Sequence, residues 1–98
     1  MIVSEITVQD LIIYLRLNGA DIDANETEKI GEMLDSAKQW VQSYTGLTLD
    51  ECDKYPDFVS AVYVLVQDMY DNRCFYVDKN FVNKVVKSIL DMHSINYI

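Results

Sequence analysis

The segment Phe58–Tyr70, FVSAVYVLVQDMY, decides the fold that this sequence predicts. Apart from its tyrosines, its only polar residues are Ser60, Gln67 and Asp68. Pro56 precedes the segment, and proline is favoured in the first turn of a helix. A helix that is apolar nearly all round has to be covered on more than one side. We therefore expect this helix to lie at the centre of a bundle, covered partly by its own chain and partly by a neighbouring subunit.

A second long helix is expected upstream. Its apolar residues recur at spacings of three and four, which is typical of a stripe that faces a core: Ile30, Met33, Leu34, Ala37, Trp40, Val41 and Tyr44. Asn25 or Thr27 is placed to cap its start, and Thr45-Gly46 is placed to end it. From the two long helices we predict these core residues: Trp40, Tyr44, Phe58 and Leu65.

A shorter helix is expected near the N-terminus. Thr7 is placed as its N-cap, and Asp10, three residues on, completes a weak form of the capping box. Ile6 and Leu11 are spaced as a hydrophobic staple across the same turn. Asn18-Gly19 is a stop signal, so the helix is expected to end there.

The last helix is expected after a cap at Asp78 or Asn80, with an apolar stripe on one face. The residues of that stripe are Val82, Val85, Val86, Ile89 and Leu90. The segment 47–55 reads as a polar, solvated connector between the two long helices. The fold class that follows is all-α: a single domain over residues 1–98, built as a small bundle of about four helices, with two longer central helices and shorter ones at the two ends.

The chain is acidic. Its 98 residues carry sixteen Asp and Glu against eight Lys and Arg, which gives a net charge of −8 and a pI near 4.3. Binding to nucleic acid or to an anionic membrane surface needs Lys and Arg, so neither is expected. Twelve of the acids but only four of the bases precede Phe58, which suggests an oriented molecule with one acidic surface. No signal peptide and no membrane-spanning stretch are expected.

Two groups of carboxylates are the candidates for an acidic surface that faces a channel or a partner: Asp21 and Asp23 before the second helix, and Asp50, Glu51 and Asp53 in the connector. The stretch that starts at Asp21 begins like a calcium-binding loop. The sixth position of such a loop needs glycine for its sharp turn, and here it is Glu26. We therefore expect no metal site.

The sequence offers little for catalysis. His93 is the single histidine, and we expect it to pack or cap rather than act as a base. Cys52 and Cys74 are 22 positions apart and are expected to be free thiols. There is no glycine-rich phosphate loop and no Gly-x-Ser-x-Gly elbow. We expect no catalytic residues and no cofactor, and hence a protein that is not an enzyme.

Motifs in a fixed order cover nearly the whole chain. Ile6-Thr7 opens the first helix, and the second helix ends in Tyr44-Thr45-Gly46. The apolar third helix ends in Tyr70-Asp71-Asn72-Arg73, and the tail segment 88–96 follows. In their order and spacing these motifs resemble the head–tail connector proteins of tailed phages and prophages, also described as head-completion or DNA-packaging proteins. The sequence departs from the common pattern at Asn18-Gly19-Ala20 and at Cys74-Phe75.

The resemblance implies a structural protein of the virion. Members of this family are small helical subunits that assemble into a ring below the portal of the capsid. The ring extends the DNA channel, through which DNA passes without specific binding, and provides the surface for tail attachment. The implied partners are further copies of the chain, the phage portal protein and a tail-side completion protein. The implied location is the bacterial cytoplasm during assembly and then the head–tail junction of the virion.

A ring needs an interface in which one patch meets a different patch on the next subunit. The residues predicted for that subunit interface are Val59, Tyr63, Tyr70, Ile95, Tyr97 and Ile98. The acidic charge leaves an alternative open, an acidic helical protein-binding module such as a DNA mimic. Such a mimic is expected to spread its carboxylates at phosphate-like intervals along one face, whereas here the acids cluster at helix starts and loops.

Overall fold

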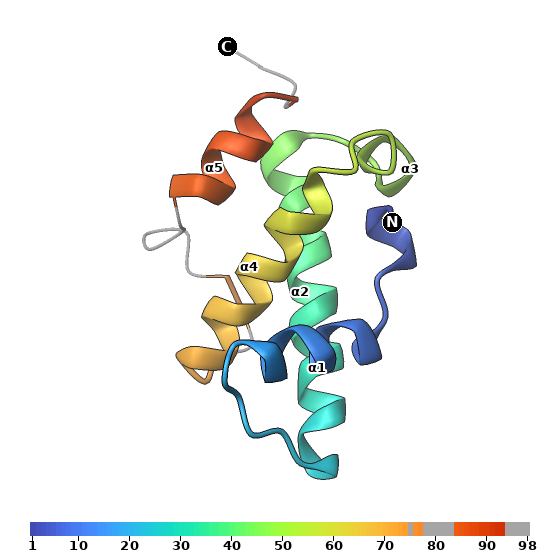
Figure 1. The fold of residues 1–98 in the computed structure, drawn as a ribbon. Helices are drawn as coiled ribbons and strands as arrows, with labels where there is room; N and C mark the ends of the chain where they lie inside the picture. Colours follow the sequence, from blue (N-terminus) through green and yellow to red (C-terminus); the bar gives the residue numbers. More distant parts are fainter. Residues whose placement is uncertain (75, 78–83, 94–98) are drawn as a thin grey trace.

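Two long helices, α2 (Thr27–Thr45) and α4 (Phe58–Asp71), lie side by side at the centre of the fold (Figure 1). The computed structural model describes residues 1–74, 76–77 and 84–93, and the regular elements in these ranges are all helical. The shorter elements are η1 (Val3–Glu5), α1 (Val8–Leu17), η2 (Ala24–Glu26), α3 (Leu49–Cys52) and α5 (Lys84–Asp91). The predicted all-α fold class, a small bundle around two longer helices, is confirmed.

The ends of α1 follow the capping chemistry that the sequence predicts. The Asp10 amide donates to the Thr7 hydroxyl at 3.2 Å, and the Thr7 amide donates to the Asp10 carboxylate at 2.9 Å. This reciprocal pair is a capping box, which satisfies two amides that the helix itself leaves without partners. The helix ends at Asn18, and Gly19 follows with a φ of +94°, a left-handed conformation that glycine adopts without steric cost.

The start of α2 differs from the prediction. Neither Asn25 nor Thr27 caps it; instead the Asp23 carboxylate accepts from the Asn25 amide at 2.9 Å and caps η2, which runs directly into α2. Aspartate is well suited to this place because its carboxylate reaches an amide two residues further along the chain. The helix ends as predicted, at Gly46 with a φ of +74°.

The connector between the two long helices is more ordered than predicted. Residues Leu49–Cys52 form α3, with Thr48 as its N-cap. The Thr48 amide donates to the Glu51 carboxylate at 3.0 Å, and the Glu51 amide donates to the Thr48 hydroxyl at 3.2 Å. The prediction of a solvated connector is wrong here because Thr48-x-x-Glu51 is a capping box, which nucleates a turn of helix.

The predicted core residues divide into three cases. Phe58 is fully buried and Leu65 is 2% exposed, so both are confirmed. Trp40 is half-buried and packs against the edge of the core. Tyr44 is 37% exposed, and its prediction as a core residue is wrong. Its ring stacks on Trp40 at 4.9 Å, and its hydroxyl donates to the Asp91 carboxylate at 2.6 Å, an interaction that raises the pKa of Tyr44.

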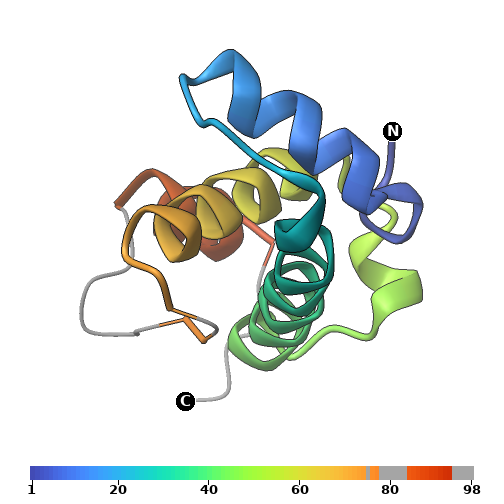
Figure 2. The same cartoon turned by 90° about the horizontal axis from the view of Figure 1, so that it is seen from below.

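Two further helices, α1 and α5, pack on the central pair of α2 and α4. α1 crosses α2 and α4 on one side (Figure 2). Its own side chains Leu11 and Leu15 are fully buried. α5 packs on α4 and α2 through Val86 and Leu90. Val85 is 59% exposed, so its prediction as part of the buried stripe is wrong; it lies about 100° around the helix from Val86. Other residues predicted for this helix lie outside the described residues: Asp78, Asn80 and Val82.

Truncation of the central aromatic side chain tests the core. Phe58→Ala removes a fully buried ring and leaves a cavity, so we expect it to lower the free energy of unfolding by about 3–5 kcal/mol. Urea unfolding followed by circular dichroism measures the change. Ile13→Ala, at a side chain that is 50% exposed, is the control and is expected to cost about 0.5 kcal/mol or less. Equal losses for the two variants would contradict this description of the core.

Candidate functional site

The apolar helix α4 is covered by its own chain more fully than the sequence led us to expect. It packs against α2, α5, α1 and η1, and none of its own large apolar side chains is exposed. Val59 and Tyr63 are half-buried, and Tyr70 is only 7% exposed. Little of α4 is therefore left for a neighbouring subunit to cover. The other residues predicted for the subunit interface lie outside the described residues: Ile95, Tyr97 and Ile98.

Tyr63 makes its contacts with the N-terminal part of the chain. Its ring centroid lies 4.9 Å from that of Tyr14 on α1, and its hydroxyl donates to the Met1 sulfur at 3.5 Å. Burial raises the pKa of Tyr63, and the negative charge of Asp10 raises it further. Because Tyr63 is already engaged inside the subunit, only part of its ring is free to meet a second copy.

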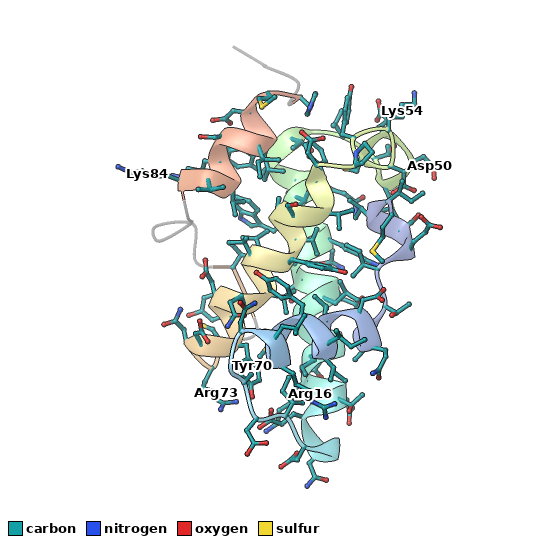
Figure 3. The ribbon with its side chains drawn as sticks, in the orientation of Figure 1. Arg16, Asp50, Lys54, Tyr70, Arg73 and Lys84 are labelled. Atoms are coloured by element: carbon teal, nitrogen blue, oxygen red, sulfur yellow. The ribbon has the colours of Figure 1, made fainter. Side chains whose placement is uncertain are left out.

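Tyr70 belongs to a polar cluster that joins the start of α2 to the end of α4. Its hydroxyl donates to the Glu26 carboxylate at 2.7 Å. The Arg73 guanidinium lies 4.5 Å from the centroid of the Tyr70 ring and 3.7 Å from Glu26. Arg73 has a φ of +53°, the left-handed region in which the chain turns sharply after the helix. Figure 3 shows Tyr70 and Arg73 together at this end of the molecule.

A cavity of about 260 Å³ adjoins this cluster. Its lining residues are Glu26, Lys29, Ile30, Met33, Tyr70 and Arg73. The cavity is slightly below the usual range for small-molecule sites, about 300–1,000 Å³. Its carboxylate is already held by a hydroxyl and a guanidinium, which is the arrangement of a structural tie between helices. No local sequence pattern predicts this tie, because Glu26 and Tyr70 are 44 positions apart.

The predicted acidic residues do not share one surface. Asp21 and Asp23 lie at the N-terminal end of α2, whereas Asp50, Glu51 and Asp53 lie beyond its C-terminal end, in and after α3. In Figure 3 Asp50 stands at the opposite end of the molecule from Tyr70 and Arg73. The nineteen residues of α2 separate the two groups by about 28 Å. The two groups therefore form separate surfaces, and the expectation that one of them faces a channel or a partner stays a prediction.

Three of these five carboxylates hold local structure. Asp23 caps η2, and Glu51 completes the capping box of α3, whose hydrogen bonds from Thr48 lower the pKa of Glu51. Asp53 accepts hydrogen bonds from the Ser4 amide at 3.0 Å and the Ser4 hydroxyl at 2.6 Å, which ties the end of α3 to η1. The remaining two, Asp21 and Asp50, are exposed.

A continuous acidic stripe instead follows the outer face of α2. Glu28, Glu32 and Asp35 are all exposed and recur at spacings of four and three, which places them on one side of the helix. This side lies opposite the residues that α2 buries, among them Ile30 and Ala37. The helical spacing of these three residues is visible in the sequence, although the carboxylates predicted for an acidic surface are those in the loops.

Four of the exposed large apolar side chains among the described residues lie on or next to the two helices that pack on the central pair, and the others are Met1, Tyr44 and Tyr76. On α1, Ile13 is 50% and Leu17 is 82% exposed, one helical turn apart. On and just after α5, Val85 is 59% and Met92 is 71% exposed. Single exposed apolar residues are ordinary on a protein surface, but pairs on two separate elements indicate places where another surface can pack.

His93 fastens the end of α5 to the start of α4. Its ring stacks on Tyr55 at 4.0 Å between centroids, and its Nε2 lies 3.2 Å from the Asp57 carboxylate. Phe58 meets the same ring edge-on at 5.6 Å. These contacts give the imidazole a packing role. Cys52 is buried, which raises the pKa of its thiol, and Cys74 is partly exposed; both are free thiols.

Within the described residues, no three His, Cys, Asp or Glu side chains gather as a metal site would require, and no helix has the length and apolar character needed to cross a bilayer. No family model, no curated protein and no solved structure matches this chain.

The Tyr70 hydroxyl provides a test of the polar cluster. Tyr70→Phe keeps the ring under Arg73 and removes the hydrogen bond to Glu26, so we expect a loss of about 1–2 kcal/mol in unfolding free energy at neutral pH. Tyr55→Phe is the matched control, because it keeps the ring that stacks on His93 and removes a hydroxyl that forms no hydrogen bond to the described residues. Equal losses in the two variants would argue against the tie.

The same pair of variants should differ in alkali. Burial, followed by the hydrogen bond to Glu26, raises the pKa of Tyr70 above its ordinary value of 10.0. A raised pKa in the folded state contributes stability that is present below pH 10 and is lost as the pH rises through the folded-state value. Urea titrations between pH 8 and about 11 should therefore show a smaller loss of stability in Tyr70→Phe than in wild type or Tyr55→Phe.

Proposed function

We propose that this chain is a structural subunit of a phage head–tail connector ring, which docks below the portal, extends the DNA channel and offers the surface for tail attachment. The observation that supports it best is the presence of exposed apolar pairs on two separate elements, Ile13 with Leu17 on α1 and Val85 with Met92 at α5. The proposal also draws on the order of the connector-like motifs in the sequence.

The two apolar pairs suit a head-to-tail contact. α1 meets α4 where Tyr14 packs on Tyr63, whereas α5 meets the start of α4 where His93 lies beside Asp57. The pairs therefore belong to different parts of the surface. A ring is built from contacts in which one patch meets a different patch of the next copy, and a chain with two distinct patches can supply both halves.

The negative net charge of the chain suits a subunit that lines a DNA channel. A net charge of −8 gives repulsion from the phosphate backbone, so passing DNA is not retained. The burial of α4 also fits a subunit that folds by itself before it assembles, because the chain completes its hydrophobic core without a neighbouring copy. We propose that the portal protein and a tail-side completion protein are the partners on the two sides of the ring.

A second candidate, an acidic module that mimics DNA, is favoured by the α2 stripe. Glu28, Glu32 and Asp35 are spaced by about 6 and 4.5 Å along the helix, a regular row of negative charge. Such a module would bind a basic DNA-binding protein as a single copy and would not assemble on a portal. Native mass spectrometry with each kind of partner separates the two candidates.

Assembly with the portal protein of the same phage tests the connector proposal. We expect the wild-type chain to form closed rings on the portal, observed by native mass spectrometry and sedimentation velocity. Leu17→Glu places a charge in a contact that should be apolar, so we expect assembly to weaken about tenfold or more. Gln9→Glu, an exposed position on the same helix, is the matched control and should assemble normally.

A wild-type chain that stays monomeric at every concentration, with and without the portal protein, would overturn the connector proposal. Rings that form equally well with Leu17→Glu would leave the ring standing and remove α1 from its interface. Circular dichroism of each variant shows whether the fold is retained, since Leu17 is 82% exposed and its replacement should not affect the core.

A further inference from the structure

We propose that, beside the apolar contact between α5 and α1, the ring interface pairs the outer face of α5 on one copy with the acidic stripe of α2 on the next copy, where α1 packs on α2. This inference rests on the proposed connector function and names the two surfaces that meet. The outer face of α5 consists of these residues: Lys84, Val85, Lys87, Ser88 and Met92. The acidic stripe of α2 consists of Glu28, Glu32 and Asp35.

The outer face of α5 is both basic and apolar. Lys84 and Lys87 are exposed and lie one turn apart, and no hydrogen bond or ion pair holds either ammonium among the described residues. Figure 3 shows the Lys84 side chain directed away from the bundle. The one carboxylate on this side, Asp91, accepts a hydrogen bond from Tyr44 at 2.6 Å. On this face the ammonium groups of Lys84 and Lys87 are therefore available to a partner, and Met92 beside them is 71% exposed.

Within the described part of the chain, no other two cations share a turn of one helix. Arg16 donates to the Ile22 carbonyl at 3.0 Å, and Arg73 is paired with Glu26. Lys38, three residues after Asp35 on α2, donates to the Ile6 carbonyl at 3.5 Å. The positive face of α5 is thus a local feature in an acidic molecule, and it calls for an acidic partner.

The α2 stripe matches this face in sign and in spacing. Glu32 and Asp35 are three residues apart, as are Lys84 and Lys87, so each pair spans about 4.5 Å along its helix. None of the three stripe carboxylates forms an ion pair within the described residues. Two helices laid against each other can therefore bring both lysines within reach of carboxylates.

The two faces cannot meet within one subunit. α5 turns Val86 and Leu90 towards α4 and α2, so its lysines face outwards. α2 buries the side that carries Ile30 and Ala37, so its acidic stripe also faces outwards. Since each face points away from the shared core, they can pair only between copies. A contact between two different faces is the head-to-tail kind that a ring requires.

Charge reversal on each side tests the pairing. One variant carries Lys84→Glu and Lys87→Glu, and the other carries Glu32→Lys and Asp35→Lys. Each variant alone brings like charges together in every contact, so we expect ring assembly on the portal protein to weaken about tenfold or more. A one-to-one mixture of the two should restore assembly, because acidic α5 then meets basic α2 and basic α5 meets acidic α2 in alternation.

The variant that carries all four changes is the internal control, because it has the net charge of the wild type and should also assemble. Wild-type assembly should weaken as sodium chloride rises, since exposed pairs are screened over about 8–10 Å at 0.10–0.15 M salt. Native mass spectrometry reports composition, so the mixed rings should contain the two variants in equal number. Circular dichroism confirms that each variant is folded.

The outcomes separate the pairing from the connector function. If the wild type assembles and each double variant assembles equally well, the α5–α2 pairing is wrong and the connector function stands. If both variants are folded but neither the mixture nor the four-change variant assembles, these faces contact the portal or another partner, and the pairing is again wrong. If the wild type never assembles, the connector function itself fails.

Discussion

The burial of α4 against α2 is the contact on which the rest of the molecule depends. Phe58 and Leu65 are buried on α4, Ile30 and Val41 are buried on α2, and both α1 and α5 pack on this pair. A chain of 98 residues has little apolar surface to spare, so a helix as apolar as α4 is what makes a single core possible. Because the chain covers α4 itself, any assembly has to use surfaces on the outer elements.

Local features were predictable from the sequence, and contacts between distant segments were not. The Thr7–Asp10 capping box and the α2 stop at Gly46 depend on residues a few positions apart, so their patterns are visible in the sequence. The Thr48–Glu51 box has the same pattern, but the acidic composition of the connector favours the interpretation as a solvated loop. The ties from Tyr70 to Glu26 and from Tyr44 to Asp91 span 44 and 47 positions, and no spacing rule anticipates them.

The distribution of negative charge has two separate causes. Asp10, Asp23 and Glu51 are acidic because helix starts favour carboxylates that accept from free amides. These carboxylates are used within the fold. In the α2 stripe, Glu28 lies in the first turn, where the helix dipole favours a negative charge, whereas Glu32 and Asp35 lie further along a solvent-facing side. The excess of acids before Phe58 was therefore a poor guide to a functional surface, and only the structure separates the two groups.

The sign of the charges also bears on how copies can associate. Two α2 stripes facing each other, or two basic α5 faces, would juxtapose like charges, which disfavours a symmetric dimer through either surface. The proposed pairing of α5 with α2 brings opposite charges together. It leaves α5 open on one copy and α2 open on the other, so further copies can add in the same orientation. Exposed ion pairs are individually weak, about 0–1 kcal/mol each. A contact of this kind would thus direct the orientation of copies while a template such as a portal supplies closure into a ring.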